Sequence, residues 1–301
     1  MRLNDLAIDF TYLLVNERDK KFGITVNTVG FQPIAPNTSY PSTDHPTYYY
    51  FNPENGRVLS EYQIVYISKG EGTFSSTSNK KTKVSKGQAI FLFPGEWHSY
   101  CPKKETGWNE YYIGFEGHII DSLIENNFIS KENKILDIGI NDDLINLFST
   151  AIKIANDEKK FAQQFLGGIV FHILGSMFSL AANKNHEDEE TLQIIERAKV
   201  IMNENVHKDI DIKDIATKLG TSYSWFRKLF KEYTGYAPTQ YFNELRLRKS
   251  KELLLESNLA IKEIAYKLNF SSIEYFLSFF KKRVNITPSE YRRLNSSVGN
   301  E

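Results

Sequence analysis

Four residues near the C-terminus combine positive charge with the spacing of one helix face. Ser224, Arg227, Lys228 and Lys231 stand at positions i, i+3, i+4 and i+7, so their side chains share one side of an α-helix. Arginine and lysine side chains can reach guanine edges in the major groove of DNA, or they can bind phosphates. The stripe therefore predicts a DNA contact; the alternative is an ordinary solvated helix face.

A weaker version of this stripe occurs 50 residues later. Glu274, Leu277, Ser278 and Lys281 repeat the spacing with far less positive charge. We predict that the first copy supplies most of the affinity and that the second reads DNA more permissively, with Leu277 against a thymine methyl group. The full set of candidate DNA contacts is Tyr223, Ser224, Arg227, Lys228, Lys231, Ile273, Glu274, Leu277, Ser278 and Lys281.

Both stripes belong to an internal repeat. Residues 214–219 (DIATKL) recur 49 residues later as 263–268 (EIAYKL), and residues 229–231 (LFK) recur 50 residues later as 279–281 (FFK). In each copy a short apolar helix precedes a turn and a second helix that carries the stripe. This is the form of a helix-turn-helix motif, and a solvated surface does not require the same two-helix unit twice.

Residues that end or begin helices support this arrangement. Gly220 ends the first helix of copy one because glycine tolerates the left-handed conformation. Ser271 with Glu274 predicts a capping box in copy two. Residues 238–256 between the copies predict one helix of roughly 28 Å, which could hold the two recognition helices near the roughly 34 Å of one DNA turn. Arg246 on this helix is a candidate phosphate contact or a solvated charge.

Length and composition fit a two-domain globular protein of 301 residues. The formal net charge is zero, but from residue 191 onward 19 Lys and Arg stand against 13 Asp and Glu, while residues 1–190 hold 18 against 24. A basic C-terminal third points to an anionic partner for that part. The single cysteine, Cys101, excludes an internal disulfide and fits the cytoplasm, and the charged N-terminus does not resemble a signal peptide.

The stretch at residues 161–182 is apolar over nearly the length needed to span a bilayer. Gln163, Gln164 and His172 are among the polar residues that dilute it, and no basic flank anchors it. We therefore interpret it as a buried or dimer-forming helix and expect no contact with a membrane.

The N-terminal half alternates strand-forming runs with glycine turns. Runs rich in Val, Ile, Tyr and Phe occupy residues 62–68, 73–75, 89–93 and 110–115. Turns that contain glycine separate them at residues 69–72, 86–87 and 94–95. This pattern is typical of a small antiparallel barrel or sandwich.

Helical periodicity follows the strands, with helices expected near residues 142–155 and 161–182. The polar, acidic segment NKNHEDEE then marks a boundary, and every later segment predicts helix. The expected organisation is a first domain at residues 1–182, a linker at 183–191 and a DNA-binding domain at 192–301.

The chain resembles the AraC/XylS family of bacterial regulators. The residues that carry the resemblance in the C-terminal part are 215–216 (IA), 229–231 (LFK), Gly235, Pro238, 246–247 (RL), 263–265 (EIA), 280–282 (FKK) and 287–292 (TPSEYR). In the N-terminal half, which is similar to the family's cupin-type sensor domain, they are 62–72 (YQIVYISKGEG), 93–100 (FPGEWHSY), Trp108 and 115–117 (FEG).

The resemblance implies a two-domain α+β fold: an N-terminal cupin-like β-barrel with dimerisation helices, and an all-α C-terminal domain with two helix-turn-helix motifs. It implies a homodimeric transcription activator in the cytoplasm, whose partners are promoter DNA, RNA polymerase and a small-molecule effector, with a sugar favoured. The ligand positions of the family, with neighbouring side chains, fall on Arg57, His98, Tyr100, Trp108, Glu110 and Tyr112. Aromatic faces would pack on sugar C–H surfaces while Arg57 and Glu110 bind hydroxyls.

Two other functions remain open at this point. A cupin-type sugar isomerase or epimerase fused to a DNA-binding module would need a metal site or an acid–base pair. His98 has no partner histidines in the preceding strands, so we expect no metal, no cofactor and no enzymatic activity. Alternatively, the barrel serves only as a dimer scaffold without an effector. Independently of this choice, Trp97, Trp108 and the aromatic cluster at residues 48–51 could be ordinary core residues of the barrel.

Overall fold

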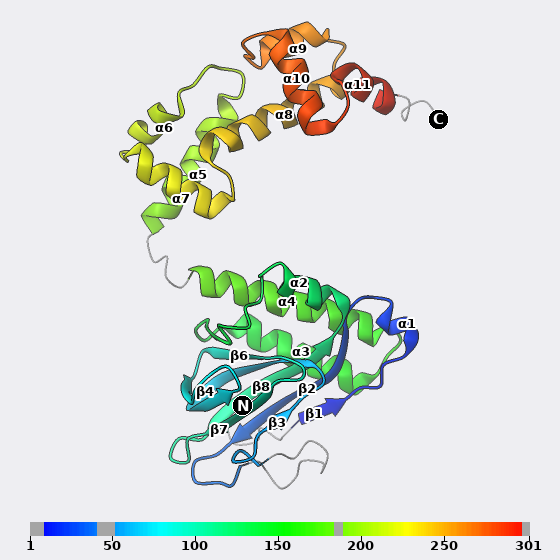
Figure 1. Cartoon of the computed structure of the whole chain (residues 1–301), viewed down its shortest axis with the longest axis vertical. Helices are drawn as coiled ribbons and strands as arrows, with labels where there is room; N and C mark the ends of the chain where they lie inside the picture. Colours follow the sequence, from blue (N-terminus) through cyan, green and yellow to red (C-terminus); the bar gives the residue numbers. More distant parts are fainter. Residues whose placement is uncertain (1–8, 41–51, 184–188, 297–301) are drawn as a thin grey trace. The chain divides into compact units, whose positions relative to one another are not determined.

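The computed structural model describes residues 9–40, 52–183 and 189–296. The chain forms two compact units, Met1–Glu187 and Asp188–Glu301, which Figure 1 shows as a strand-rich unit and a helical unit. A β-sheet-rich N-terminal domain and an all-helical C-terminal domain are what the sequence predicts, and both predictions are confirmed.

The N-terminal unit is built on antiparallel strands with helices on one face (Figure 1). Its strands are β1 (Asp9–Tyr12), β2 (Thr25–Ile34), β3 (Arg57–Val58), β4 (Tyr62–Ser76), β5 (Thr82–Ser85), β6 (Gln88–Leu92), β7 (Trp97–Pro102), β8 (Trp108–Glu116) and β9 (Ile135–Asp137). Its helices are α1 (Glu17–Lys20), α2 (His118–Glu125), α3 (Asp142–Asp157) and α4 (Ala162–Asn183).

Strand β4 joins the two parts of the sheet. Its first half pairs with β6 and β8, and its second half pairs with β5 and β7. The turn expected at residues 69–72 is therefore wrong. The pairing with β8 shifts register between Ile67 and Lys69, and Gly70 has φ +84°, so a bulge bends the strand where a turn was expected.

The strand order β1-β2-β8-β4-β6-β9 begins and ends at different strands. The sheet of the described residues is thus an open, strongly bent arrangement and not a closed barrel. The two faces of β4 bury different side chains because successive residues point to opposite sides. Ile64 and Tyr66 pack toward α3 and α4, whereas Val65 and Ile67 point into the concave interior.

Helix α4 is long and apolar enough to cross a membrane by length and composition. One side of it, including Leu166, Val170, Ile173 and Met177, is fully buried in the core that it shares with the sheet. This agrees with the interpretation of residues 161–182 as a buried helix of the domain.

The C-terminal unit consists of two helix-turn-helix motifs joined by a long helix (Figure 1). The elements are α5 (Glu189–Glu204), α6 (Ile212–Lys218), α7 (Tyr223–Thr234), α8 (Pro238–Glu256), α9 (Ile261–Lys267), α10 (Ile273–Val284) and α11 (Pro288–Ser296). Phe242 and Leu245 of α8 belong to the core of the first motif, and Leu247 and Leu254 belong to the core of the second. The connecting helix therefore fixes how the two motifs sit on each other.

Candidate DNA interface and ligand site

Helix α7 places the basic stripe on its exposed side. Ser222 caps the helix by accepting a hydrogen bond from the backbone N–H of Trp225 at 3.3 Å, and Phe226 and Phe230 bury the opposite side. Gly220, which ends α6 as predicted, has φ +72°. The exposed side carries the α7 stripe, which lines one shallow hollow of the surface: Ser224, Arg227, Lys228 and Lys231.

Helix α10 carries the weaker stripe, but it begins differently from the prediction. The N-cap is Ser272, whose hydroxyl accepts from the backbone N–H of Tyr275 at 3.1 Å, so the capping box predicted for Ser271 and Glu274 is wrong. The backbone N–H at this helix start and the Ser272 hydroxyl lower the pKa of Glu274, which keeps its exposed carboxylate charged. A negative charge on this face opposes phosphate binding, in line with a weaker second copy.

The remaining candidate contacts of copy two differ in exposure. Ser278 and Lys281 are exposed, whereas Leu277 is half-buried. Tyr223 and Ile273, the first residues of α7 and α10, are also half-buried, and Tyr223 packs against the core of the first motif. These three side chains can therefore offer only part of their surface to a partner.

Two exposed aromatic residues beside the stripes escaped the sequence analysis. Trp225 of α7 is 43% exposed and Tyr275 of α10 is 51% exposed. They occupy equivalent positions, each three residues after the N-cap serine of its helix. The repeat itself was the available signal, because it places a large aromatic residue with a polar tip at the same point of both copies.

Arg246 is not a freely solvated charge, because it contacts other parts of the C-terminal unit. Its Nη2 donates to the backbone oxygen of Lys208 at 3.0 Å, and its Nε donates to that of Val206 at 3.4 Å. The guanidinium also lies 4.6 Å from the centre of the Phe242 ring. Arg246 thus ties α8 to the segment that follows α5 and stiffens the first motif.

The predicted ligand residues Trp108, Glu110 and Tyr112 all lie on the concave side of β8, because they alternate along the strand. Their exposed fractions are 1%, 2% and 7%. Trp108 Nε1, Glu110 Oε2 and the Tyr112 hydroxyl make no hydrogen bond within the part of the chain that the structure describes. Buried polar atoms are normally paired, so these three atoms mark a place where a polar partner would be stabilised.

Arg57 gathers the other predicted ligand residues. Its Nη2 donates to the Tyr100 hydroxyl at 2.8 Å and to Gln63 Oε1 at 3.3 Å. Its Nε donates to His98 Nε2 at 3.4 Å, so the His98 ring must carry its proton on Nδ1, which faces the Glu96 backbone oxygen at 3.1 Å. The structure therefore brings Arg57, His98 and Tyr100 together as a single cluster.

Burial controls the charge state of two of these groups. It raises the pKa of Glu110 to about 8, although the Arg57 guanidinium favours the charged form. It lowers the pKa of His98 to about 4, and the neighbouring Arg57 charge acts in the same direction. At neutral pH Glu110 is mainly protonated and His98 is neutral. No three metal-binding side chains come together among the described residues.

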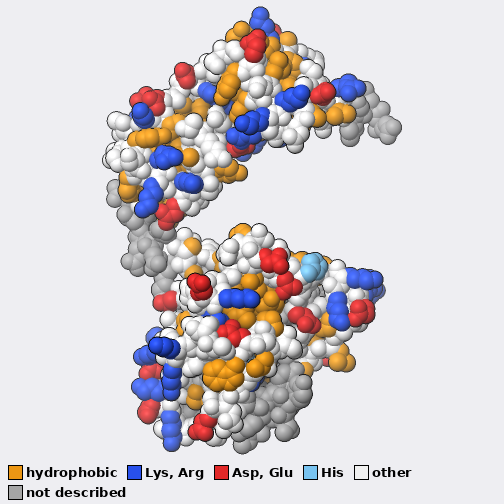
Figure 2. Space-filling model, viewed as in Figure 1, with side chains coloured by type: hydrophobic (Ala, Val, Ile, Leu, Met, Phe, Trp, Pro, Cys, Tyr) orange, Lys and Arg blue, Asp and Glu red, His pale blue; other side chains and the backbone are white. Residues whose placement is uncertain are grey.

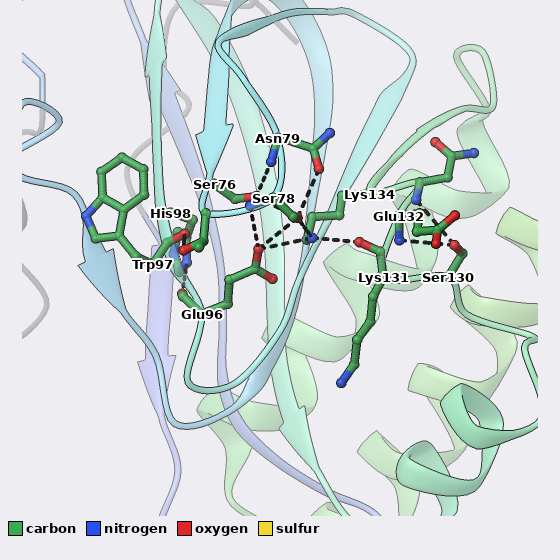
Figure 3. A network of polar contacts seen from close by, with 12 residues as sticks. Ser76, Ser78, Asn79, Glu96, Trp97, His98, Ser130, Lys131, Glu132 and Lys134 are labelled. Atoms are coloured by element: carbon green, nitrogen blue, oxygen red, sulfur yellow. Dashed lines mark hydrogen bonds and ion pairs between the residues drawn. The ribbon is translucent and has the colours of Figure 1, made fainter.

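A buried lysine holds the far side of this cluster in place. Figure 3 shows Glu96 between His98 and Lys134. The Lys134 ammonium is 2% exposed and lies 3.1 Å from Glu96 Oε1, and it also donates to the Lys131 backbone oxygen at 2.7 Å and to the Ser78 hydroxyl. This network joins three segments behind His98, so the histidine has little freedom to turn.

Other residues of the concave interior were not predicted. Gln63 of β4 and Glu61, directly before this strand, share the face of Val65 and Ile67 and are 4% and 5% exposed, so the strand pattern could have indicated them. Tyr40 meets the Trp108 ring edge-on at 6.4 Å, and nothing in its local sequence signals this.

The interpretation of Trp97 as a core residue is wrong. It is 38% exposed and donates its Nε1–H to the Asn55 backbone oxygen at 2.8 Å. Trp108, in contrast, is fully buried in the interior cluster, where it packs 6.1 Å from the Tyr100 ring. The aromatic cluster at residues 48–51 lies outside the residues that the structure describes. The two tryptophans of this unit therefore differ in environment, and only Trp108 is part of the candidate ligand site.

Comparison with known proteins matches both units of the chain to known domains. Residues 215–294 match a helix-turn-helix domain, and residues 36–174 match the AraC-like ligand-binding domain. The chain belongs to the AraC family of transcriptional regulators. Such regulators bind DNA, so this AraC-family chain is a DNA-binding transcription regulator with a ligand-binding domain.

Named relatives cover most of the chain. It is 26% identical to the Lactose operon transcription activator of Staphylococcus xylosus over 82% of this chain and 88% of the relative. It is 25% identical to the Msm operon regulatory protein of Streptococcus mutans over 78% of this chain and 85% of the relative. A crystal structure of an AraC-type regulator from Chromobacterium violaceum matches 34% of this chain and 92% of that one, at 33% identity and a TM-score of 0.33.

Proposed function

We propose that this AraC-family regulator activates a carbohydrate operon when a sugar binds in the concave interior of its N-terminal unit. The observation that carries the proposal is the set of buried, unpaired polar atoms on Trp108, Glu110 and Tyr112. Hydroxyl groups of a sugar would satisfy them, and the aromatic faces of Trp108 and Tyr100 suit sugar C–H surfaces. The name of the Staphylococcus xylosus relative, which refers to the lactose operon, supports this class of effector.

A panel of sugars tests the proposal. An effector should raise the melting temperature of the purified protein and change its affinity for DNA from directly upstream of its own gene. Glu110→Gln and Tyr112→Phe should weaken the sugar's effect on melting without abolishing DNA binding. If the protein converts candidate sugars to products, it is an enzyme. If no sugar of a broad panel changes its melting temperature or its DNA affinity, the N-terminal unit serves as a scaffold.

On the C-terminal unit, the proposal assigns the promoter contacts to the α7 stripe first and to Ser278 and Lys281 of α10 second. This assignment rests on exposure and charge: the α7 stripe holds three cations, whereas the α10 stripe holds one cation beside the charged Glu274. The regulator would act in the cytoplasm, where its promoter lies, and would contact RNA polymerase there.

Trp225 should also contact DNA, because it stands exposed beside the α7 stripe. We expect Trp225→Ala to weaken promoter binding by roughly 1 kcal/mol, about fivefold. DNA should change the tryptophan emission of the wild-type protein, and Trp225→Phe should lose most of that change. Tyr266→Ala is the control, since Tyr266 is an exposed aromatic residue of α9 outside both recognition helices. Unchanged emission on saturation with DNA would contradict the contact.

Dimerisation is assigned to the outer side of α4. Phe165 and His172 are exposed there, as is Phe161 directly before the helix, and a Cβ atom added to Gly168 or Gly175 would meet no atom within 4 Å. Small residues between large apolar ones allow a second helix to approach closely. A second copy of this chain would bury this surface, which the sheet leaves uncovered.

Phe165→Glu should therefore weaken the dimer at least tenfold, since it would bury a charge in the interface, by roughly 1.4 kcal/mol or more. Sedimentation equilibrium on the full chain measures the effect. Phe128→Glu is the matched control, because Phe128 is 65% exposed in the same unit but lies outside α4. An equal effect of both changes, or no effect of either, would argue against α4 as the interface.

A further inference from the structure

A second basic surface lies on the N-terminal unit, around β5 and the hairpins next to it. Figure 2 shows Lys and Arg side chains gathered along one edge of this unit. Seven exposed lysines form the surface, which we name the lysine patch: Lys69, Lys80, Lys81, Lys83, Lys86, Lys103 and Lys104. Among the described residues, Trp97 at the start of β7 is the exposed large apolar side chain that borders these hairpins, where its backbone oxygen accepts from the N–H of Thr77.

Contacts show that the lysine patch is continuous across three strands. Lys83 of β5 and Lys103, which follows β7, both bind Glu71 of β4, with Nζ–O distances of 2.5 and 3.0 Å. Lys81 lies close enough to Cys101 of β7 to lower the pKa of that thiol, which burial raises. Because alternate strand residues share a face, these side chains stand together on the outer surface of the β5–β4–β7 part of the sheet.

The charge of the lysine patch contrasts with the rest of the N-terminal part. It contains seven of the 18 Lys and Arg residues of residues 1–190 but only Glu71 and Glu105 of the 24 acidic residues, a formal charge of +5 against −11 for the remainder. Lys80, Lys81, Lys86 and Lys104 take part in no ion pair within the described residues. An acidic domain that concentrates its cations in this way presents a surface suited to a polyanion.

We propose that the lysine patch binds the phosphate backbone of promoter DNA next to the site read by the recognition helices. Lysine is a point charge without the planar fork of arginine, so a surface of lysines alone fits phosphates without regard to sequence. A protein partner would call for a core of several aromatic or apolar anchors, whereas β4, β5 and β7 carry one exposed large apolar side chain among the described residues, Trp97.

The short connection between the two units keeps the lysine patch close to any DNA that the C-terminal unit binds. Residues 184–188 are all that separate α4 from α5, and each residue of chain spans at most about 3.5 Å. Once the C-terminal unit holds its site, the N-terminal unit is tethered within reach of the neighbouring duplex. Weak phosphate contacts then form at a high effective concentration.

The test removes three patch lysines that hold no ion pair, in the variant Lys80→Gln/Lys81→Gln/Lys104→Gln of the full chain. With a promoter duplex of about 60 bp, six helical turns, the variant should bind roughly tenfold more weakly at low salt. The slope of log K against log salt should fall in magnitude by about 0.9 for each phosphate that the variant no longer neutralises. With a duplex of about 20 bp, two turns, wild type and variant should bind alike.

The matched control is Lys21→Gln/Lys131→Gln/Lys153→Gln, which removes the same charge from exposed positions of the same unit that hold no ion pair among the described residues. It should keep the wild-type slope on both duplexes. A patch variant that keeps the wild-type affinity and slope on the long duplex would overturn the proposal. The lysines would then only protect edge strand β5 from pairing with other sheets, or bind an acidic protein. Melting temperature and sedimentation confirm that both variants remain folded and associated as the wild type is.

Discussion

Arg227→Ala should weaken binding of the full-length regulator to its promoter by about 1–3 kcal/mol, which is roughly five- to 150-fold. Arg227 is exposed on α7, flanked by Lys228 and backed by a helix whose opposite side is fixed in the core. Its planar guanidinium can bind guanine O6 and N7 together, which a lysine cannot do with the same geometry. The loss should therefore be largest for the preferred sequence. Titration of labelled promoter DNA at physiological salt measures it.

Lys281→Ala provides the comparison for copy two. Lys281 shares its stripe with the charged Glu274, so we expect a smaller loss of affinity and a salt slope reduced by about 1. Arg197→Ala is the control for Arg227, because Arg197 is an exposed arginine of α5 outside both recognition helices. If Arg227→Ala bound as wild type does while Lys281→Ala lost most of the affinity, α10 would be the chief reader and our ranking of the two copies would be wrong.

The helical unit was predictable in detail because its determinants are local. Helix α8 occupies residues 238–256, the range that the sequence predicts, since Pro238 suits the first turn of a helix. Gly220 ends α6 as its left-handed conformation requires. The N-cap of α10 was mistaken by one residue because Ser271 and Ser272 are both suitable caps. Only the backbone at each serine distinguishes them.

The sheet was predictable only in part, because strand pairing is not local. The runs at residues 89–93 and 110–115 lie in or next to β6 and β8. The prediction separated the two halves of β4 at the glycines near Gly70, where the strand in fact bends and continues. Strand β2 was not predicted, although its pairing with β8 makes it part of the core.

The candidate ligand site also combines residues that local sequence could indicate with residues that only strand pairing brings together. Alternation along β8 is visible in the sequence, and it places Trp108, Glu110 and Tyr112 on one face. The contact between Arg57 and Tyr100 depends on β3 pairing with β7, and the position of Tyr40 depends on the path of a loop. The resemblance to the family could indicate Arg57 and the three residues of β8, but only the folded chain shows which of their polar atoms make no hydrogen bond.

Glu110→Gln should change how the stability of the protein depends on pH. Glu110 is 2% exposed, and burial raises its pKa to about 8, well above the ordinary value near 4.5 that it regains on unfolding. Between these values the folded state binds the extra proton, so the wild-type protein should lose stability as pH rises from about 4.5 to about 8. Each pH unit within the window corresponds to about 1.4 kcal/mol.

His98 opposes this trend over part of the range. Its pKa is lowered to about 4 in the folded protein, whereas the ordinary value is 6.5. Between these two pH values the unfolded state binds a proton that the folded state does not, and this favours unfolding. Stability should therefore rise as pH increases from about 4 to 6.5. The contributions of Glu110 and His98 therefore offset each other below pH 6.5. From pH 6.5 to 8 the folded state keeps His98 neutral and the unfolded state loses its remaining proton, which changes stability by only about 0.4 kcal/mol. Over the same range the Glu110 contribution should lower the free energy of unfolding by about 2 kcal/mol.

Urea unfolding of wild type and Glu110→Gln at pH 6.5 and 8 isolates this effect, since the amide fills the same space without titrating. Between pH 6.5 and pH 8 the free energy of unfolding of the variant, relative to that of wild type, should rise by about 2 kcal/mol. The comparison excludes Glu61, whose pKa burial also raises, because that group is present in both proteins. Glu105→Gln, an exposed carboxyl on the turn before β8, should keep the wild-type dependence. A Glu110→Gln protein with the same pH dependence as wild type would mean that Glu110 is already paired with a charge, leaving no neutral carboxyl to receive a sugar hydroxyl.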